Sequence, residues 1–256
     1  MRHLLYLSLT AALLCAQPDP DDRWQAFLAW LSERPPDSTP ANLLRPYRAE
    51  LIRKGMPPAE ADREMERLGH LAFVRPDGAK VLWNKIYAGR DPIFIGTPNA
   101  LLASAIEGRK PGKALDFGMG QGRNAVYLAM QGWDVTGFDP SDEGVRIAQG
   151  NAAKAGVKIR AVVASDDRFD LGMAQWDLIV MTYVRSPTAH DAERIGRALA
   201  PGGIFVYENG SDRHNELLKL FQPFRILRFE DVEALPDWNP GEKMRLERLV
   251  AEKPRE

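Results

Sequence analysis

The chain has 256 residues, of which 27% are charged, and its formal net charge at pH 7 is −1. This near-neutral balance lacks the basic excess of nucleic-acid-binding proteins, so we expect no nucleic-acid partner. The single cysteine excludes a zinc site built from several cysteines, and we expect no bound metal. The length suffices for one α/β domain with a substantial core and a smaller extension.

The first 17 residues have the layout of a secretory signal peptide. Arg2 and His3 precede an apolar run from Leu4 to Ala16, after which the sequence turns polar. The run is too short to span a bilayer as a helix, so we expect no stable membrane span after processing. The only cysteine, Cys15, lies inside this segment. The alternative interpretation is an apolar helix that packs on the domain.

Residues 18–78 are expected to form a small helical extension. Trp24, Phe27 and Leu31 recur at the spacing of an amphipathic helix. The sequence Arg-Pro-Asp-Gly at 75–78 predicts a turn that bounds the extension. The three expected helices cover residues 21–34, 46–55 and 58–71.

Two short helices are predicted between this extension and the first strand. Trp83 and Tyr87 lie four residues apart, on one face of a helix that ends at Gly89. After a loop over 90–97, a new helix opens at Pro98. The aromatic pair either belongs to the core or helps to cover a ligand site, and the two roles are compatible.

The most informative motif begins with a buried strand, Ala114 to Phe117, and continues into a glycine-rich loop and a helix that starts near Arg123. Alternating glycines remove Cβ atoms where a ligand must lie against the backbone. The N–H groups at a helix start favour electron-rich groups. Asp116, at the end of the strand, adds a negative charge. The loop glycines are Gly118, Gly120 and Gly122.

The next strand, over 133–138, ends in Asp139. An acidic side chain at this tip, about 20 residues after the first motif, can accept hydrogen bonds from both hydroxyls of a ribose. The alternative is a favourable charge at the start of the helix that follows Pro140. A nicotinamide dinucleotide site is disfavoured, because its fingerprint needs a small residue where Arg123 stands.

The remaining sequence predicts five more strands, which completes a seven-stranded α/β layout. Strand four, over 176–182, contains a continuous apolar run typical of a strand buried on both faces. Thr188 and Asp191 have the spacing of a capping box at the next helix. The other expected strands cover 157–163, 204–208, 225–229 and 243–251, and the expected helices cover 141–155, 188–199 and 215–221.

Taken together, these motifs resemble one family. Trp83-x-x-x-Tyr87, Pro98-Asn99-x-Leu101-Leu102 and the glycine motif with Arg123-Asn124-Ala125 are similar to the tellurite-resistance and thiopurine methyltransferase branch of class I S-adenosylmethionine-dependent methyltransferases. The resemblance covers about residues 80–256. It implies a Rossmann-like doubly wound seven-stranded sheet, mostly parallel with the last strand antiparallel, in a domain over 79–256. It also implies S-adenosylmethionine as the cofactor.

The resemblance assigns roles to residues around the glycine loop. An acidic residue after strand three, Asp166 or its substitute Asp167, would reach the adenine amino group, and Phe169 would pack on the ring. The helix with Trp83 and Tyr87 would cover the site. The expected cofactor-binding residues are Asp116, Gly118, Gly120, Gly122, Asn124, Asp139, Asp166, Phe169 and Thr182.

The acceptor side is less specified by the sequence. Tyr183 and Arg185 follow strand four, at the edge where open α/β sheets bind ligands, and are expected to contact the substrate. Tyr183, His190 and Glu208 are candidates for contact with the acceptor or for a general base. No spacing assigns the base.

The expected activity is in-line methyl transfer to a small molecule. The resemblance implies soft sulfur, selenium or tellurium nucleophiles, which can be anionic near neutral pH and then need no dedicated base. Two alternatives stay open: an envelope protein that binds a nucleotide or metabolite without turnover, and a nicotinamide oxidoreductase. The N-terminus favours export, whereas cofactor supply favours the cytoplasm. The sequence determines neither the acceptor nor the oligomeric state.

Overall fold

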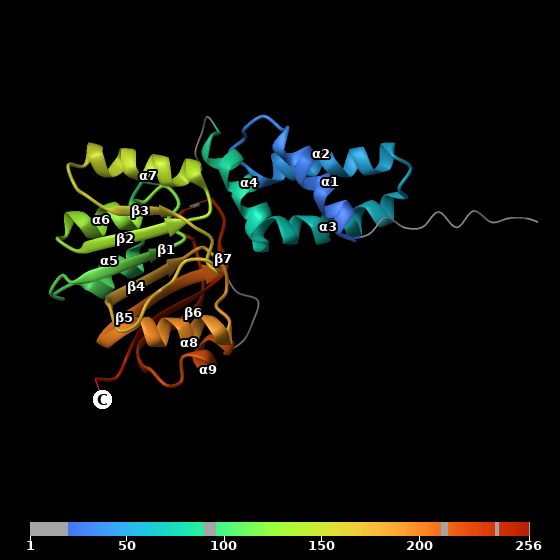
Figure 1. The fold of residues 1–256 in the computed structure, drawn as a ribbon. Helices are drawn as coiled ribbons and strands as arrows, with labels where there is room; N and C mark the ends of the chain where they lie inside the picture. The colour runs from blue at the N-terminus through green and yellow to red at the C-terminus, as the bar shows by residue number, and fades with distance from the viewer. Residues whose placement is uncertain (1–19, 90–95, 211–214, 239–240, 256) are drawn as a thin grey trace, which may run out of the picture.

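The computed structural model describes residues 20–89, 96–210, 215–238 and 241–255. The predicted signal peptide, residues 1–17, lies outside the described residues. Within the described ranges, no helix combines the length and apolar character that a membrane crossing requires. Figure 1 shows a twisted sheet with helices on both faces and a group of helices, α1 to α4, that stands beside the carboxyl ends of its first strands.

Seven strands form one sheet in the order β3-β2-β1-β4-β5-β7-β6. The pairs β1–β2, β1–β4, β2–β3 and β4–β5 are parallel, whereas β7 runs antiparallel to both β5 and β6. The expected doubly wound sheet with an antiparallel last strand is therefore confirmed. The strands are β1 (Lys113–Phe117), β2 (Asp134–Asp139), β3 (Arg160–Val163), β4 (Trp176–Thr182), β5 (Leu199–Gly210), β6 (Arg225–Ala234) and β7 (Met244–Glu252).

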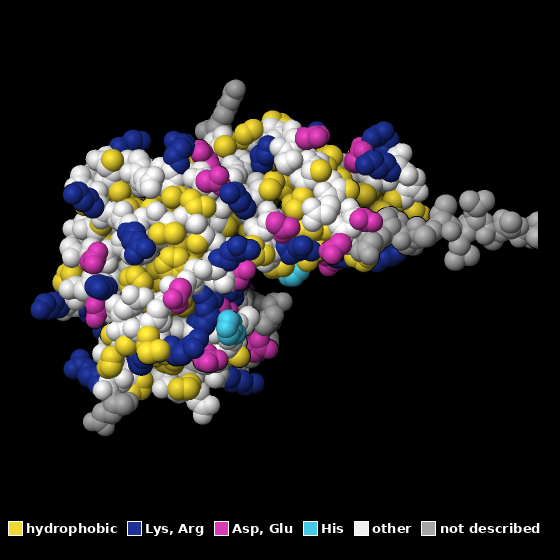
Figure 2. Space-filling model, viewed as in Figure 1, with side chains coloured by type: hydrophobic (Ala, Val, Ile, Leu, Met, Phe, Trp, Pro, Cys, Tyr) yellow, Lys and Arg dark blue, Asp and Glu magenta, His cyan; other side chains and the backbone are white. Residues whose placement is uncertain are grey.

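The helices fall into an N-terminal group and a group that covers the sheet. The first comprises α1 (Pro20–Ser32), α2 (Pro40–Arg53), α3 (Pro58–Val74) and α4 (Pro76–Tyr87). The second comprises α5 (Ala100–Ile106), α6 (Arg123–Met130), α7 (Asp142–Lys154), α8 (Ala189–Ala198) and α9 (Glu216–Leu220). On the face drawn in Figure 2, basic and acidic side chains are interspersed.

Strand β4 shows how the sheet builds its core. Leu178 and Val180 pack on one face with α5 and α6, whereas Ile179 and Met181 pack on the other with α8 and α9. All four side chains are fully buried. Because successive side chains of a strand point to opposite faces, a strand covered on both sides is apolar throughout. This is why the expected bounds of the strand match the observed ones.

Two local expectations in the extension are wrong. Helix α2 begins at Pro40, not at Pro46, because proline needs no donor in the first turn of a helix and the Thr39 hydroxyl caps the N–H of Asn42. No turn bounds the extension at 75–78: Arg75 alone separates α3 from α4, and Pro76 opens α4. In addition, β3 is shorter than expected, and β5 and β6 are longer.

Helix α4 belongs to two packing units. Its Leu82 and Ile86 are fully buried in a core shared with α1, α2 and α3. On another side, its Asn84 donates to Asp142 over 2.9 Å and accepts from the Ser141 hydroxyl over 2.6 Å at the start of α7. The boundary expected at residues 78 and 79 stays a prediction, and α4 joins the segments on either side of it.

The packing of α4 on α1 predicts a matched pair of stability changes. A Cβ atom at Gly78 would lie 2.6 Å from Cη2 of Trp24, whereas at Gly69 it would meet nothing within 4 Å. We expect Gly78→Ala to lower the free energy of unfolding. Overpacking costs about 1–3 kcal/mol, which outweighs the gain from the higher helix propensity of alanine. Gly69→Ala should raise it by about 1 kcal/mol. Urea denaturation measures both, and equal effects of the two changes would contradict this packing.

Candidate active site

A cavity of about 910 Å³ lies at the carboxyl ends of β1, β2 and β4. Open α/β sheets bind ligands at this edge. Its lining combines the loop between β1 and α6, the residues after β4, and parts of α3 and α4. The expected cofactor residues other than Phe169 therefore meet the helix with Trp83 and Tyr87 at one cavity.

The glycine loop has the backbone conformation that the sequence indicates. Gly118, Gly120 and Gly122 have φ angles of +66°, +53° and +79°, in the left-handed region that favours glycine. The protein itself fills part of the space left by the absent side chains. A Cβ atom at Gly120 would overlap the Tyr87 hydroxyl, and one at Gly122 would lie 2.8 Å from the Cβ of Ala148. The loop therefore packs closely against α4 and α7.

Asp139 holds this loop in place. Its side chain is 5% exposed, and its two carboxylate oxygens accept the N–H groups of Gly120, over 2.9 Å, and of Ser141, over 2.8 Å. Burial raises the pKa of Asp139 to about 6, against the lowering effect of these two N–H groups. Each oxygen of an ionised carboxylate has a second lone pair, so Asp139 can still accept two hydroxyl groups from a ligand.

Asp116 is a buried acid with an unsatisfied oxygen. It is 2% exposed, lines the cavity, and its Oδ2 has no hydrogen-bond partner among the described residues. Burial raises its pKa to about 7, and the positive charge of Arg123 lowers it only in part. A buried polar atom left unpaired costs about 1–3 kcal/mol, so this oxygen favours a donor supplied by a ligand.

Asn124 and Thr182 connect three elements at the floor of the cavity. The Asn124 amide donates to the Thr182 hydroxyl over 2.9 Å, and its oxygen accepts the N–H of Asn99 over 2.9 Å. Both side chains line the cavity. They hold the start of α6 against the end of β4 and the start of α5.

Helix α4 places two stacked aromatic rings over the glycine loop. The ring centroids of Trp83 and Tyr87 are 5.6 Å apart, with 25° between the ring planes, and both rings line the cavity. Burial raises the pKa of Tyr87 well above its ordinary value, so the phenol keeps its proton. Residues 90–95, most of the loop expected to complete this cover, lie outside the described residues.

The residues after β4 lie on the opposite wall. Tyr183 has a φ of +56° and lines the cavity, and its hydroxyl donates to Glu208. Burial, reinforced by the carboxylate of Glu208, raises the pKa of Tyr183 far above its ordinary value. Arg185 forms an ion pair with Asp166 over 2.6 Å and another with Asp191 over 2.6 Å.

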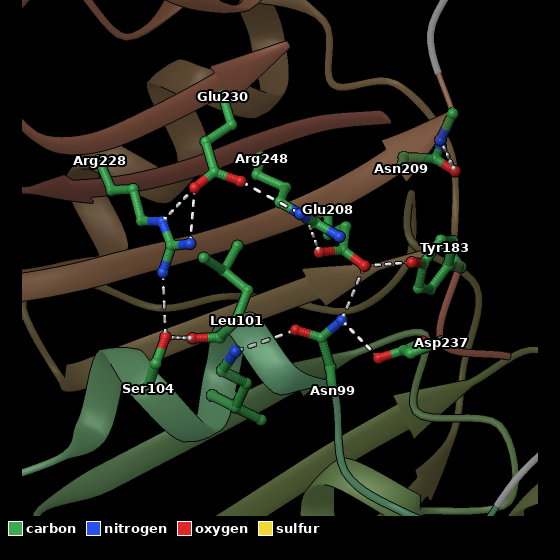
Figure 3. Close-up of polar contacts among 12 residues, drawn as sticks. Asn99, Leu101, Ser104, Tyr183, Glu208, Asn209, Arg228, Glu230, Asp237 and Arg248 are labelled. Carbon is green, nitrogen blue, oxygen red and sulfur yellow. Dashed lines mark hydrogen bonds and ion pairs between the residues drawn. The ribbon is translucent and has the colours of Figure 1, made fainter. Parts of the chain in front are cut away.

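Glu208 lies in a buried network beneath the cavity, shown in Figure 3. It is 2% exposed and accepts from Tyr183, from Asn99 over 3.1 Å and from Arg248 over 2.6 Å. The Asn99 amide also donates to Asp237 over 2.8 Å. With three donors on its two oxygens, Glu208 orients Tyr183 and is not exposed to a substrate.

Three expected site residues lie elsewhere than the sequence suggested. His190 is exposed on the first turn of α8 and is not among the cavity-lining residues. Glu208 also lies outside the lining, in the network just described. Phe169 stacks on Phe138, with the ring centroids 4.3 Å apart, and it is Phe138 that faces the cavity. Of the three catalytic candidates, Tyr183 alone lines the cavity.

Sequence reasoning assigned no role to two residues that shape the site. Asn99 caps α5 by accepting the N–H of Leu102 over 2.9 Å, a pattern visible in Pro98-Asn99 before an apolar helix. Asp237 pairs with Arg123 over 2.9 Å from an irregular segment that carries no sequence signal.

The buried acids predict an unusual pH dependence of stability. The pKa of Asp116 rises from 3.8 to about 7 on folding, so the folded state binds its proton more tightly than the unfolded chain does. The free energy of unfolding should therefore fall as the pH rises from 3.8 to about 7. We expect Asp116→Asn to reduce that slope in urea titrations of the ligand-free protein. Asp134→Asn, which alters an exposed carboxylate, should retain it; an unchanged slope in Asp116→Asn would refute the assignment.

Comparison with known proteins is consistent with this geometry. Residues 114–203 match the model of a methyltransferase domain. The probable S-adenosyl-L-methionine-dependent methyltransferase TehB of Haemophilus influenzae is 33% identical over 137 residues, 45% of this chain and 45% of that protein. The ubiquinone biosynthesis O-methyltransferase of Methylobacterium nodulans is 35% identical over 102 residues, 36% of this chain and 38% of that protein.

The fold has solved counterparts. The crystal structure of TehB from Haemophilus influenzae superposes with a TM-score of 0.53 and 21% identity, covering 59% of this chain and 61% of that one. The chain spans about half or less of the length of the curated relatives it matches. The chain therefore carries a class I S-adenosylmethionine-dependent methyltransferase domain, and the resemblance to the TehB branch expected from its motifs is confirmed.

Proposed function

We propose that the protein transfers a methyl group from S-adenosylmethionine to a small-molecule acceptor whose nucleophile is a soft sulfur, selenium or tellurium atom. The observation that carries the proposal is the convergence of the glycine loop, Asp116 and Asp139 on one cavity at the carboxyl ends of β1 and β2. The match of residues 114–203 to a methyltransferase domain supports the reaction class.

The residues present fit the cofactor. The remaining lone pairs of Asp139 suit the two ribose hydroxyls, and the unsatisfied oxygen of Asp116 suits a donor such as an ammonium group. Phe138 offers an apolar ring beside Asp166 for the adenine, in place of the expected Phe169. The stacked pair on α4 lies against the glycine loop and would help to keep water from a bound cofactor.

When bound, S-adenosylmethionine supplies an electrophilic methyl group, and the acceptor atom forms the new bond to carbon as the bond from carbon to the sulfonium sulfur breaks. The chain's own residues position the partners, which supplies rate without proton transfer. Tyr183 keeps its proton and donates it to Glu208, and Glu208 is not among the cavity-lining residues. An acceptor that is already anionic needs no base. The state of these two candidates thus supports a soft nucleophile.

Titration with S-adenosylhomocysteine tests the cofactor site. We expect Asp139→Asn to weaken the binding of S-adenosylhomocysteine about 10- to 100-fold, because the ligand loses hydrogen bonds to a charged group. Asp134→Asn is the matched control, since it removes an exposed carboxylate from the start of the same strand. Calorimetry gives the dissociation constants, and urea denaturation of the same variants separates lost binding from lost folding.

No binding by the wild-type chain would refute the proposed function. Unchanged binding by Asp139→Asn would refute the role of that residue. Methyl transfer to any thiol, to selenite or to tellurite would exclude a protein that binds without turnover.

A further inference from the structure

One wall of the cavity is apolar and comes from both the extension and the methyltransferase domain. Phe73 and Val74 at the end of α3 are 43% and 48% exposed, and Met130 at the end of α6 is 60% exposed. Exposed apolar side chains scattered singly are ordinary, but several around one cavity mark a binding surface. We define this apolar wall by the lining residues Phe73, Val74, Ala79, Trp83, Val126 and Met130.

The cations of the cavity are neutralised. Arg123 and Arg185 are the basic residues among its described lining residues. Arg123 pairs with Asp237 over 2.9 Å, and Arg185 pairs with Asp166 and Asp191, each over 2.6 Å. A bound anion would have to break one of these pairs and leave a carboxylate unpaired, which is unfavourable at partly buried positions.

Two acids of the cavity further disfavour a bound anion. Asp116 and Asp139 line it and are 2% and 5% exposed. Like charges across a binding surface disfavour a partner strongly. An acceptor that carries anionic groups besides its reacting atom therefore meets negative charge without a free cation among the described lining residues.

We infer that the methyl acceptor has an uncharged apolar body, and that this body lies on the apolar wall between α3, α4 and α6. The inference rests on the proposed function, because the glycine-loop side of the same cavity is assigned there to the cofactor. It makes the extension part of the substrate site. It also excludes inorganic oxyanions such as selenite and tellurite as the molecules for which this site is shaped.

A series of unbranched alkanethiols from ethanethiol to octanethiol tests the inference in the full chain. With the proton lost to solvent, the thiolate sulfur takes the methyl group and S-adenosylhomocysteine leaves. We expect kcat/KM to rise about fourfold for each added methylene, the factor that corresponds to about 0.8 kcal/mol per buried methylene, until the wall is covered. Selenite, tellurite and 2-mercaptoethanesulfonate should be poor acceptors.

Two variants and a control locate the subsite. Val74→Asp, which places a charge on the wall, and Phe73→Ala should both flatten the dependence on chain length. Met173→Asp should retain it, since Met173 is 77% exposed and not among the cavity-lining residues. All three positions are exposed enough for the variants to fold, and urea denaturation checks this.

Binding provides a readout besides activity. The methyl alkyl sulfides, which are the products of the series, are titrated by calorimetry with and without S-adenosylhomocysteine. Affinity that rises with chain length and falls in Val74→Asp supports the inference. One outcome would overturn the inference alone. In it, S-adenosylhomocysteine binds and methyl transfer occurs, but either rate and affinity do not change with chain length or selenite is the preferred acceptor. If S-adenosylhomocysteine does not bind, yet the sulfides show the expected trend, the proposed function fails and the apolar subsite stands.

Discussion

The site depends on one buried carboxylate. Asp139 accepts N–H groups from Gly120 and from Ser141, and so ties the glycine loop to the start of α7. Ser141 in turn donates its hydroxyl to Asn84, which fixes α4 above the loop. A single side chain thus sets the distance between the floor of the cavity and its aromatic cover. The raised pKa shows that burying this charge opposes folding, and the two N–H bonds offset only part of that effect.

The polar network under the opposite wall has a different role. Glu208 receives three donors and carries no unsatisfied oxygen, whereas Asp116 does. A paired acid that lies away from the cavity orients its neighbours, whereas an acid that lines the cavity with an unpaired oxygen is available to a ligand. This distinction separates two acids that are equally buried and that both lie near the end of a strand. It explains why Tyr183, held by Glu208, is a fixed donor and not a base.

The sequence predicted the features that are local along the chain. The seven strands, the glycine loop and the two acids at strand ends follow from periodicity and short motifs. The contacts between Asn99 and Glu208 and between Arg123 and Asp237 join residues that are 109 and 114 positions apart, so no local pattern reports them. Phe169 was assigned to the adenine because it follows the acidic turn in the sequence. The neighbouring strand β2, however, places Phe138 between Phe169 and the cavity.

The dual packing of α4 has a consequence for cooperativity. Its buried face completes the core of the extension, and its polar face is bonded to the first turn of α7. Helix α4 therefore couples the core of the extension to the domain that holds the sheet. Any ligand held beneath Trp83 and Tyr87 stabilises α4, and through it α1, which contributes no described residue to the cavity lining. The stability of the extension therefore depends on whether the site is occupied, and the extension also forms a wall of that site.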